Sequence, residues 1–140
     1  MNILVINGPN LNLLGIRNPD IYGKTSYQDL VKKIKEYCKQ KKIKVKCVQS
    51  NYEGKIVDYI QKSTKRYHGI VINAGAYTHY SIAIKDALNA IKLPKVEVHI
   101  SNIYEREEYR KINYIKDECL ASIIGKGIEG YLEAIDILVK

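Results

Sequence analysis

Two patterns of apolar and polar positions alternate along the chain. Short continuous apolar runs are typical of strands buried on both faces, and longer stretches with apolar residues every three or four positions are typical of helices with one buried face. The apolar runs predict strands at residues 2–6, 44–49, 69–73, 95–100 and 120–125. The longer stretches predict helices at residues 26–40, 53–66, 81–91 and 128–140. The run at 44–49 alternates apolar and polar residues, which indicates an edge strand.

Strands that alternate with helices indicate an α/β fold with a parallel sheet between two helical layers. A length of 140 residues fits one domain, so we expect residues 1–140 to form a single domain. By analogy, the expected architecture is a flavodoxin-like three-layer sandwich with strand order 2-1-3-4-5. Sheets of this kind bind ligands beyond the carboxyl ends of their strands, here between strands one and three.

The composition excludes several other classes of protein. With 46% hydrophobic and 27% charged residues, the chain has the balance of an ordinary globular protein. It has no apolar run of the roughly 20 residues that a membrane helix needs, and its first residues do not resemble a signal peptide, so we expect a cytoplasmic protein. The cysteines Cys38, Cys47 and Cys119 lie far apart, without the spacing of a disulfide framework or zinc site, and are expected to be buried thiols.

The basic residues exceed the acidic ones by 23 to 15, which gives a formal charge of +8. Such an excess suits either a nucleic-acid binder or an enzyme with an anionic substrate. The densest group of lysines alternates with apolar residues at positions 34–47, as on a solvated helix face, and no nucleic-acid motif or aromatic platform is present. We therefore expect a small anionic partner and no nucleic acid.

Two non-enzymatic classes with the same architecture fail on the first loop. A flavin phosphate loop is expected to be rich in Ser, Thr and Gly, whereas this one reads NGPNLNLLG. A phosphoacceptor receiver needs paired aspartates after the first strand, which here ends in Ile6 and Asn7.

The long segment from residue 7 to 25 is expected to act as a lid over a site, because long loops in compact domains are usually functional. It carries Arg17 and Tyr22 only five residues apart. A guanidinium beside a phenol stabilises the phenolate, which predicts that Tyr22 acts as a base.

The segments after strands three and four carry further polar candidates. Asn73 ends one predicted strand, and His79 precedes the next helix. Glu97 and His99 are two apart in a strand and so share one face, where a carboxylate fixes the tautomer of an imidazole that donates a proton. The basic pair at positions 106 and 110 is either a clamp over the site or surface charge among neighbouring glutamates.

Several long motifs resemble one family, the type II 3-dehydroquinate dehydratases. They are VINGPNLNLLGIRNPDIYG, QSNYEG, NAGAYTHYSIAIKDAL, VEVHISNIYEREEYR and GKGIEGYLEAI, and together they span most of the chain. The resemblance implies a shikimate-pathway lyase that removes water from 3-dehydroquinate by anti elimination through an enolate to give 3-dehydroshikimate. It also implies that the reaction needs no metal, organic cofactor or lysine Schiff base.

The resemblance implies a role for each catalytic candidate. Tyr22 corresponds to the base that removes the proton beside the ketone, and Arg17 to the residue that keeps it ionised. Asn10 corresponds to the residue that holds a water against the enolate oxygen. His99 corresponds to the general acid that protonates the departing hydroxyl, oriented by Glu97.

The same resemblance assigns the substrate contacts. They are expected, through backbone or side chain, at Asn73, His79, Ile100, Ser101 and Arg110. Arg106 matches an arginine on a second lid, whose partner is expected to be Asp86 of a neighbouring subunit. The family assembles as trimers stacked into dodecamers, so we expect a homododecamer.

Overall fold

The computed structural model describes all 140 residues and contains one five-stranded sheet. Its strands are β1 (Asn2–Asn7), β2 (Lys44–Gln49), β3 (Gly69–Asn73), β4 (Lys95–His99) and β5 (Ala121–Ile124). Their order is β2-β1-β3-β4-β5, and every pair is parallel. The predicted α/β fold and strand order are confirmed, and each strand boundary lies within one residue of the sequence-based expectation.

The burial of each strand follows its composition. β3 and β4 are buried at every position, and β1 at all but its first, because their apolar side chains are covered on both faces. The alternating β2 forms one edge of the sheet, as predicted, with Lys44 and Lys46 exposed. β5 forms the other edge.

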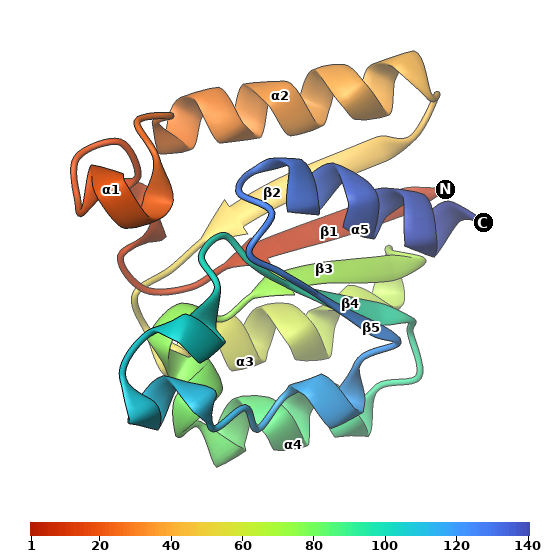
Figure 1. Cartoon of the computed structure of the whole chain (residues 1–140). Coiled ribbons are helices and arrows are strands. Elements are labelled where there is room, and N and C mark those ends of the chain that lie inside the picture. The colour runs from red at the N-terminus through yellow and green to blue at the C-terminus, as the bar shows by residue number, and fades with distance from the viewer.

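Helices cover both faces of the sheet (Figure 1). One face carries α2 (Tyr27–Gln40) and α5 (Glu129–Val139), and the other carries α3 (Glu53–Lys62) and α4 (Ile82–Ala90). The oxygens of Ser26 and Ser81 accept hydrogen bonds from the first turns of α2 and α4, so both serines cap helices as their positions suggest. The longest helix has 14 residues, and none combines the length and apolarity of a membrane span.

Two local expectations need correction, and one long segment contains short helical elements that were not predicted. The helix predicted at 53–66 ends at Lys62 and continues as a 3-10 turn, Ser63–Lys65. The segment 7–25 contains a 3-10 turn and the short helix α1 (Pro19–Tyr22), which Pro19 begins because its fixed backbone angle suits a first helical position. All three cysteines are free, but only Cys38 is fully buried, whereas Cys47 and Cys119 are half-buried.

Candidate active site

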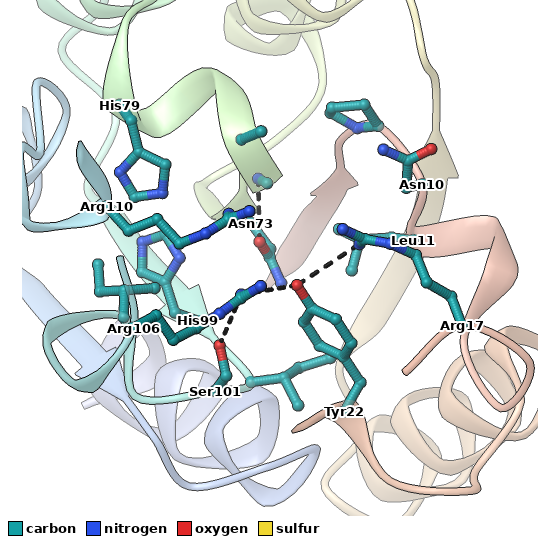
Figure 2. Close-up of a pocket in the computed structure, with 15 residues that line it drawn as sticks. Asn10, Leu11, Arg17, Tyr22, Asn73, His79, His99, Ser101, Arg106 and Arg110 are labelled. Atoms are coloured by element: carbon teal, nitrogen blue, oxygen red, sulfur yellow. Dashed lines mark hydrogen bonds between the residues drawn. The ribbon is translucent and has the colours of Figure 1, made fainter. Parts of the chain in front are cut away.

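A pocket lies at the carboxyl ends of β1, β3 and β4, where the sheet order predicts a ligand site (Figure 2). It holds about 470 Å³ of space between its atoms, open mouth included. The lining residues come from the segments that follow these three strands: Pro9, Asn10, Leu11, Arg17, Tyr22, Asn73, Gly75, Ala76, His79, His99, Ile100, Ser101, Ile103, Arg106 and Arg110. The site candidates from the sequence therefore converge here, apart from Glu97 and Asp86.

Small residues let the first two of these segments approach closely. A Cβ on Gly8 would lie 2.6 Å from the backbone oxygen of Ala74, and the Gly8 amide donates to the Asn73 carbonyl at 2.8 Å. Asn10 then adopts a left-handed conformation with φ of 68°, which asparagine tolerates better than most residues. The turn places the Asn10 side chain at the pocket without a bonding partner in the chain.

The phenol oxygen of Tyr22 accepts hydrogen bonds from two guanidinium groups. Arg106 Nη1 lies 2.7 Å from it, and Arg17 Nη1 forms a longer contact of 3.4 Å. Both guanidinium carbons also lie over the Tyr22 ring, 5.2 and 5.3 Å from its centre. The sequence predicted only Arg17 as the partner of Tyr22, whereas in the structure Arg106 lies closer to the phenol oxygen. Two cations at these distances stabilise negative charge on that oxygen.

His99 and Glu97 form the pair that their spacing predicts. His99 Nε2 donates to Glu97 Oε2 at 2.9 Å, because a carboxylate only accepts. Nδ1 of His99 makes no hydrogen bond within the chain, and His99 lines the pocket while the fully buried Glu97 stands behind it. The imidazole is therefore held by one nitrogen and leaves the other for a ligand.

Two further side chains hold Glu97, and the sequence analysis did not find them. Asn113 Nδ2 and Ser122 Oγ both donate to Glu97 Oε1, at 2.7 and 2.5 Å. Burial raises the pKa of Glu97, but the hydrogen bonds from His99, Ser122 and Asn113 outweigh it and hold the pKa below its usual value. The buried carboxylate is therefore ionised at neutral pH.

His79 lies at the pocket with one ring nitrogen already used. Its Nδ1 lies 2.7 Å from the Ile112 carbonyl oxygen, which only accepts, so Nδ1 carries a proton. Burial lowers the pKa of His79 despite that bond, and the positive groups nearby add to the effect. The neutral ring therefore presents Nε2 as an acceptor.

A buried tyrosine that the sequence analysis overlooked supports the floor of the pocket. Tyr131 of α5 is fully buried; its hydroxyl accepts from Asn73 Nδ2 at 2.9 Å and donates to Asn7 Oδ1 at 2.6 Å. Asn73 Oδ1 accepts from the Gly75 amide at 3.1 Å. Both ends of the Asn73 amide are therefore fixed. Nothing in the local sequence distinguishes Tyr131 from the other eleven tyrosines.

The pocket is suited to an anion. Three arginines line it, and no acidic residue does. The backbone amides of Ile100 and Ser101 donate to no acceptor in the chain, and the Ser101 hydroxyl lies 3.3 Å from Arg106 Nη1. Unpaired amides beside a guanidinium form a binding site for a carboxylate.

No lysine lines the pocket, and the structure contains no group of three or more His, Cys, Asp or Glu residues arranged to hold a metal ion. Asp86 is exposed on α4 and does not line the pocket of its own chain. The role expected for Asp86 thus requires a second subunit.

Comparison with known proteins agrees with this geometry. The family model described as dehydroquinase class II matches residues 1–139. The 3-dehydroquinate dehydratase of Clostridium botulinum (strain Hall) is 54% identical over 99% of this chain and 95% of the relative, and that of Prochlorococcus marinus subsp. pastoris is 51% identical over 100% and 96%. The crystal structure of type II dehydroquinase from Butyrivibrio crossotus superposes with a TM-score of 0.99 at 56% identity, covering 100% of this chain and 98% of the other. The resemblance predicted from the motifs is confirmed: the chain belongs to the class II dehydroquinase family.

Proposed function

We propose that this protein removes water from 3-dehydroquinate to give 3-dehydroshikimate on the shikimate pathway. The observation that carries the proposal is a pocket that holds a phenol bound by two guanidiniums (Figure 2). An imidazole backed by a buried carboxylate reaches the same pocket from a different segment. A base and an acid in one pocket are what a β-elimination needs. The family membership and the dehydratase relatives support the same activity.

In the proposed mechanism, the Tyr22 oxygen removes a proton from the carbon next to the ketone. Arg106 and Arg17 stabilise the negative charge that the oxygen carries before it takes the proton. The electron pair of the broken C–H bond forms an enolate. Asn10, whose side chain has no partner in the chain, holds a water that donates to the enolate oxygen.

The enolate then expels the hydroxyl from the neighbouring carbon. His99 donates the proton on Nδ1 to this hydroxyl, which leaves as water, and the charge on Glu97 stabilises the imidazolium before the transfer. The base and acid act on opposite faces of the ring, so the elimination is anti. No step uses a metal or an imine, and the lack of a lysine in the pocket supports the second point.

The remaining pocket residues bind the substrate in this proposal. Its carboxylate accepts from the Ile100 and Ser101 amides, and its ring hydroxyls contact Asn73, His79 and Arg110. Because His79 is neutral, its Nε2 accepts a hydrogen bond from a ring hydroxyl. The contact residues thus combine backbone amides for the carboxylate with an amide side chain, a neutral imidazole and one guanidinium for the hydroxyls.

We further propose a cytoplasmic homododecamer in which Asp86 of the partner subunit pairs with Arg106 near the site. The exposed position of Asp86 on α4 is compatible with this contact. Light scattering tests the assembly: twelve chains of 16.0 kDa give a mass near 192 kDa. A monomer or simple trimer would contradict the dodecamer.

The activity is tested by mixing the protein with 3-dehydroquinate and following the ultraviolet absorbance of the conjugated enone. Tyr22→Phe removes the base and should lower kcat by about 10²- to 10⁴-fold. Tyr52→Phe, at an exposed tyrosine outside the pocket, is the matched control and should leave kcat unchanged. Absence of enone with the wild-type protein, or normal turnover by Tyr22→Phe, would contradict the proposal.

A further inference from the structure

The carboxylate of Glu97 is shared between two sets of donors. Oε2 accepts from His99, which faces the pocket, and Oε1 accepts from Asn113 and Ser122, which do not line it. Glu97 is fully buried, so the protein must supply all the donors that water would otherwise provide. The three contacts span 2.5 to 2.9 Å, as expected for hydrogen bonds to a charged group.

We infer that Asn113 and Ser122 are positioning residues that keep Glu97 ionised and aimed at His99, and that they thereby set the pH range over which His99 donates its proton. The inference rests on the proposed function, because it takes His99 as the acid of the elimination.

The orientation of the Asn113 amide is fixed by its other contacts. Its Oδ1 accepts from the backbone amides of Ile115 and Lys116, each at 3.0 Å. The NH₂ group must therefore point away from those two donors, and it meets Oε1 of Glu97. Asn113 can only donate at this contact, which favours the charged carboxylate.

Ser122 reaches the same oxygen from the neighbouring strand. The register of β4 and β5 pairs Glu97 with Ser122, so the two side chains lie on the same side of the sheet. Ser122 is exposed at the edge strand although its hydroxyl contacts a buried group. A substitution at Ser122 therefore changes the donor set of Glu97 without opening the core.

The other charged and titratable groups near this pair do not replace the two donors. Along β4, the Lys95 ammonium is taken up by the carbonyls of Leu88 and Ile91. Burial raises the pKa of the Cys119 thiol to about 12, so this neighbour of Glu97 stays neutral over the working range.

Across the pocket, three groups face His99. His79 is neutral, and the guanidiniums of Arg106 and Arg110 contact Tyr22 and Glu107 respectively. These cations oppose a positive charge on His99, so its protonated form depends on the charge that Glu97 keeps. Removing a donor from Glu97 should therefore weaken the stabilisation that Glu97 gives to the protonated form of His99.

The test uses two variants, each with a matched control. Ser122→Ala deletes one donor, and Ser122→Thr keeps the hydroxyl. Asn113→Asp keeps an oxygen for the Ile115 and Lys116 amides but places a second carboxylate against Glu97. Asn89→Asp makes the same change beside the remote Glu118, whose Oε2 accepts from Asn89 at 2.9 Å.

The first readout is the pH profile of kcat. Loss of a donor raises the pKa of Glu97, so the acidic limb should move to higher pH, by about one unit in Ser122→Ala and more in Asn113→Asp, where two carboxylates share a proton. KM should change less than twofold, because neither residue lines the pocket. Ser122→Thr and Asn89→Asp should keep the wild-type profile.

The second readout needs no activity, so it separates this inference from the proposed function. The chain has only three histidines, and an NMR titration of their ring nitrogens, assigned with His99→Asn, follows His99 in the free protein. In Ser122→Ala, His99 should lose its proton at a pH about one unit lower than in the wild type, whereas Asn113→Asp adds a carboxylate and keeps net negative charge beside His99, so it should not lower that pH. An unchanged His99 titration in Ser122→Ala, or a drop in kcat that is equal at every pH, would overturn the inference even if the wild type is fully active. An inactive wild type with a shifted titration would instead refute the proposed function alone.

Discussion

Tyr131→Phe is the sharpest test of how the pocket floor is built. The substitution removes only one oxygen, which accepts from Asn73 and donates to Asn7 in a fully buried environment. Both partners lose their bond, and Nδ2 of Asn7 already has no partner in the chain. Burial also raises the pKa of Tyr131, so the group that is lost is a neutral hydroxyl at all working pH values.

The expected loss of stability follows from those two contacts. A buried polar group left without a partner costs about 1–3 kcal/mol, so the two together cost about 2–6 kcal/mol. A water molecule from the pocket that bonds to Asn73 would bring the loss of stability toward the lower end of this range. With an unfolding entropy of about 2.1 cal/mol/K per residue, a chain of 140 residues loses roughly 10 °C in Tm for every 3 kcal/mol.

The assay is urea unfolding followed by circular dichroism, at one protein concentration because assembly contributes to stability. Tyr37→Phe is the control: its hydroxyl also donates at 2.6 Å, but to Asp136, an acceptor exposed to water. Its loss should cost no more than about 1.5 kcal/mol, the lower end for a hydrogen bond to a charged group, because water can replace the donor. KM should rise in Tyr131→Phe, because the Asn73 amide is no longer fixed. Equal unfolding free energies for the two variants would refute the argument from burial.

Three further predictions concern the site. His99→Ala should abolish loss of the hydroxyl while exchange of the α-proton with solvent deuterium, measured by NMR, continues; an equal fall in both rates would contradict the separation of acid and base. The pKa of Glu97 is lowered in the folded state, so its contribution to stability is present above the ordinary carboxyl pKa of about 4.3 and is lost as the pH falls through the folded value. The free energy of unfolding should therefore drop more steeply on acidification in the wild type than in Glu97→Gln, and parallel curves would argue against the hydrogen-bonded carboxylate. EDTA, and borohydride added with the substrate, should leave turnover unchanged, and inactivation by either would contradict the metal-free and imine-free mechanism.

The sequence predicts the fold well because its signals are local. The apolar runs and the two serine caps depend on neighbouring residues. The strand order was expected only by analogy with flavodoxin-like sheets of this size. The helix predicted to Arg66 ends early because periodicity does not distinguish an α-helical turn from a 3-10 turn.

The site is predicted only where spacing along the chain carries the geometry. Glu97 and His99 meet because strand residues two apart share a face. The contact between Arg106 and Tyr22 joins residues 84 positions apart, and that of Tyr131 with Asn7 joins residues 124 apart. Such contacts depend on how the segments after β1 and β4 fold over the sheet and how α5 packs on it, and local patterns do not encode them.

The free edge of β2 has a consequence for the solubility of the chain. A strand with unpaired backbone groups is a template onto which another extended chain can add, and this leads to aggregation. Lys44 and Lys46 project their charges along this edge. A second copy of this edge would bring its own ammonium groups close to those of Lys44 and Lys46, and the like charges would repel. The two lysines therefore discourage the addition of a sixth strand beside β2.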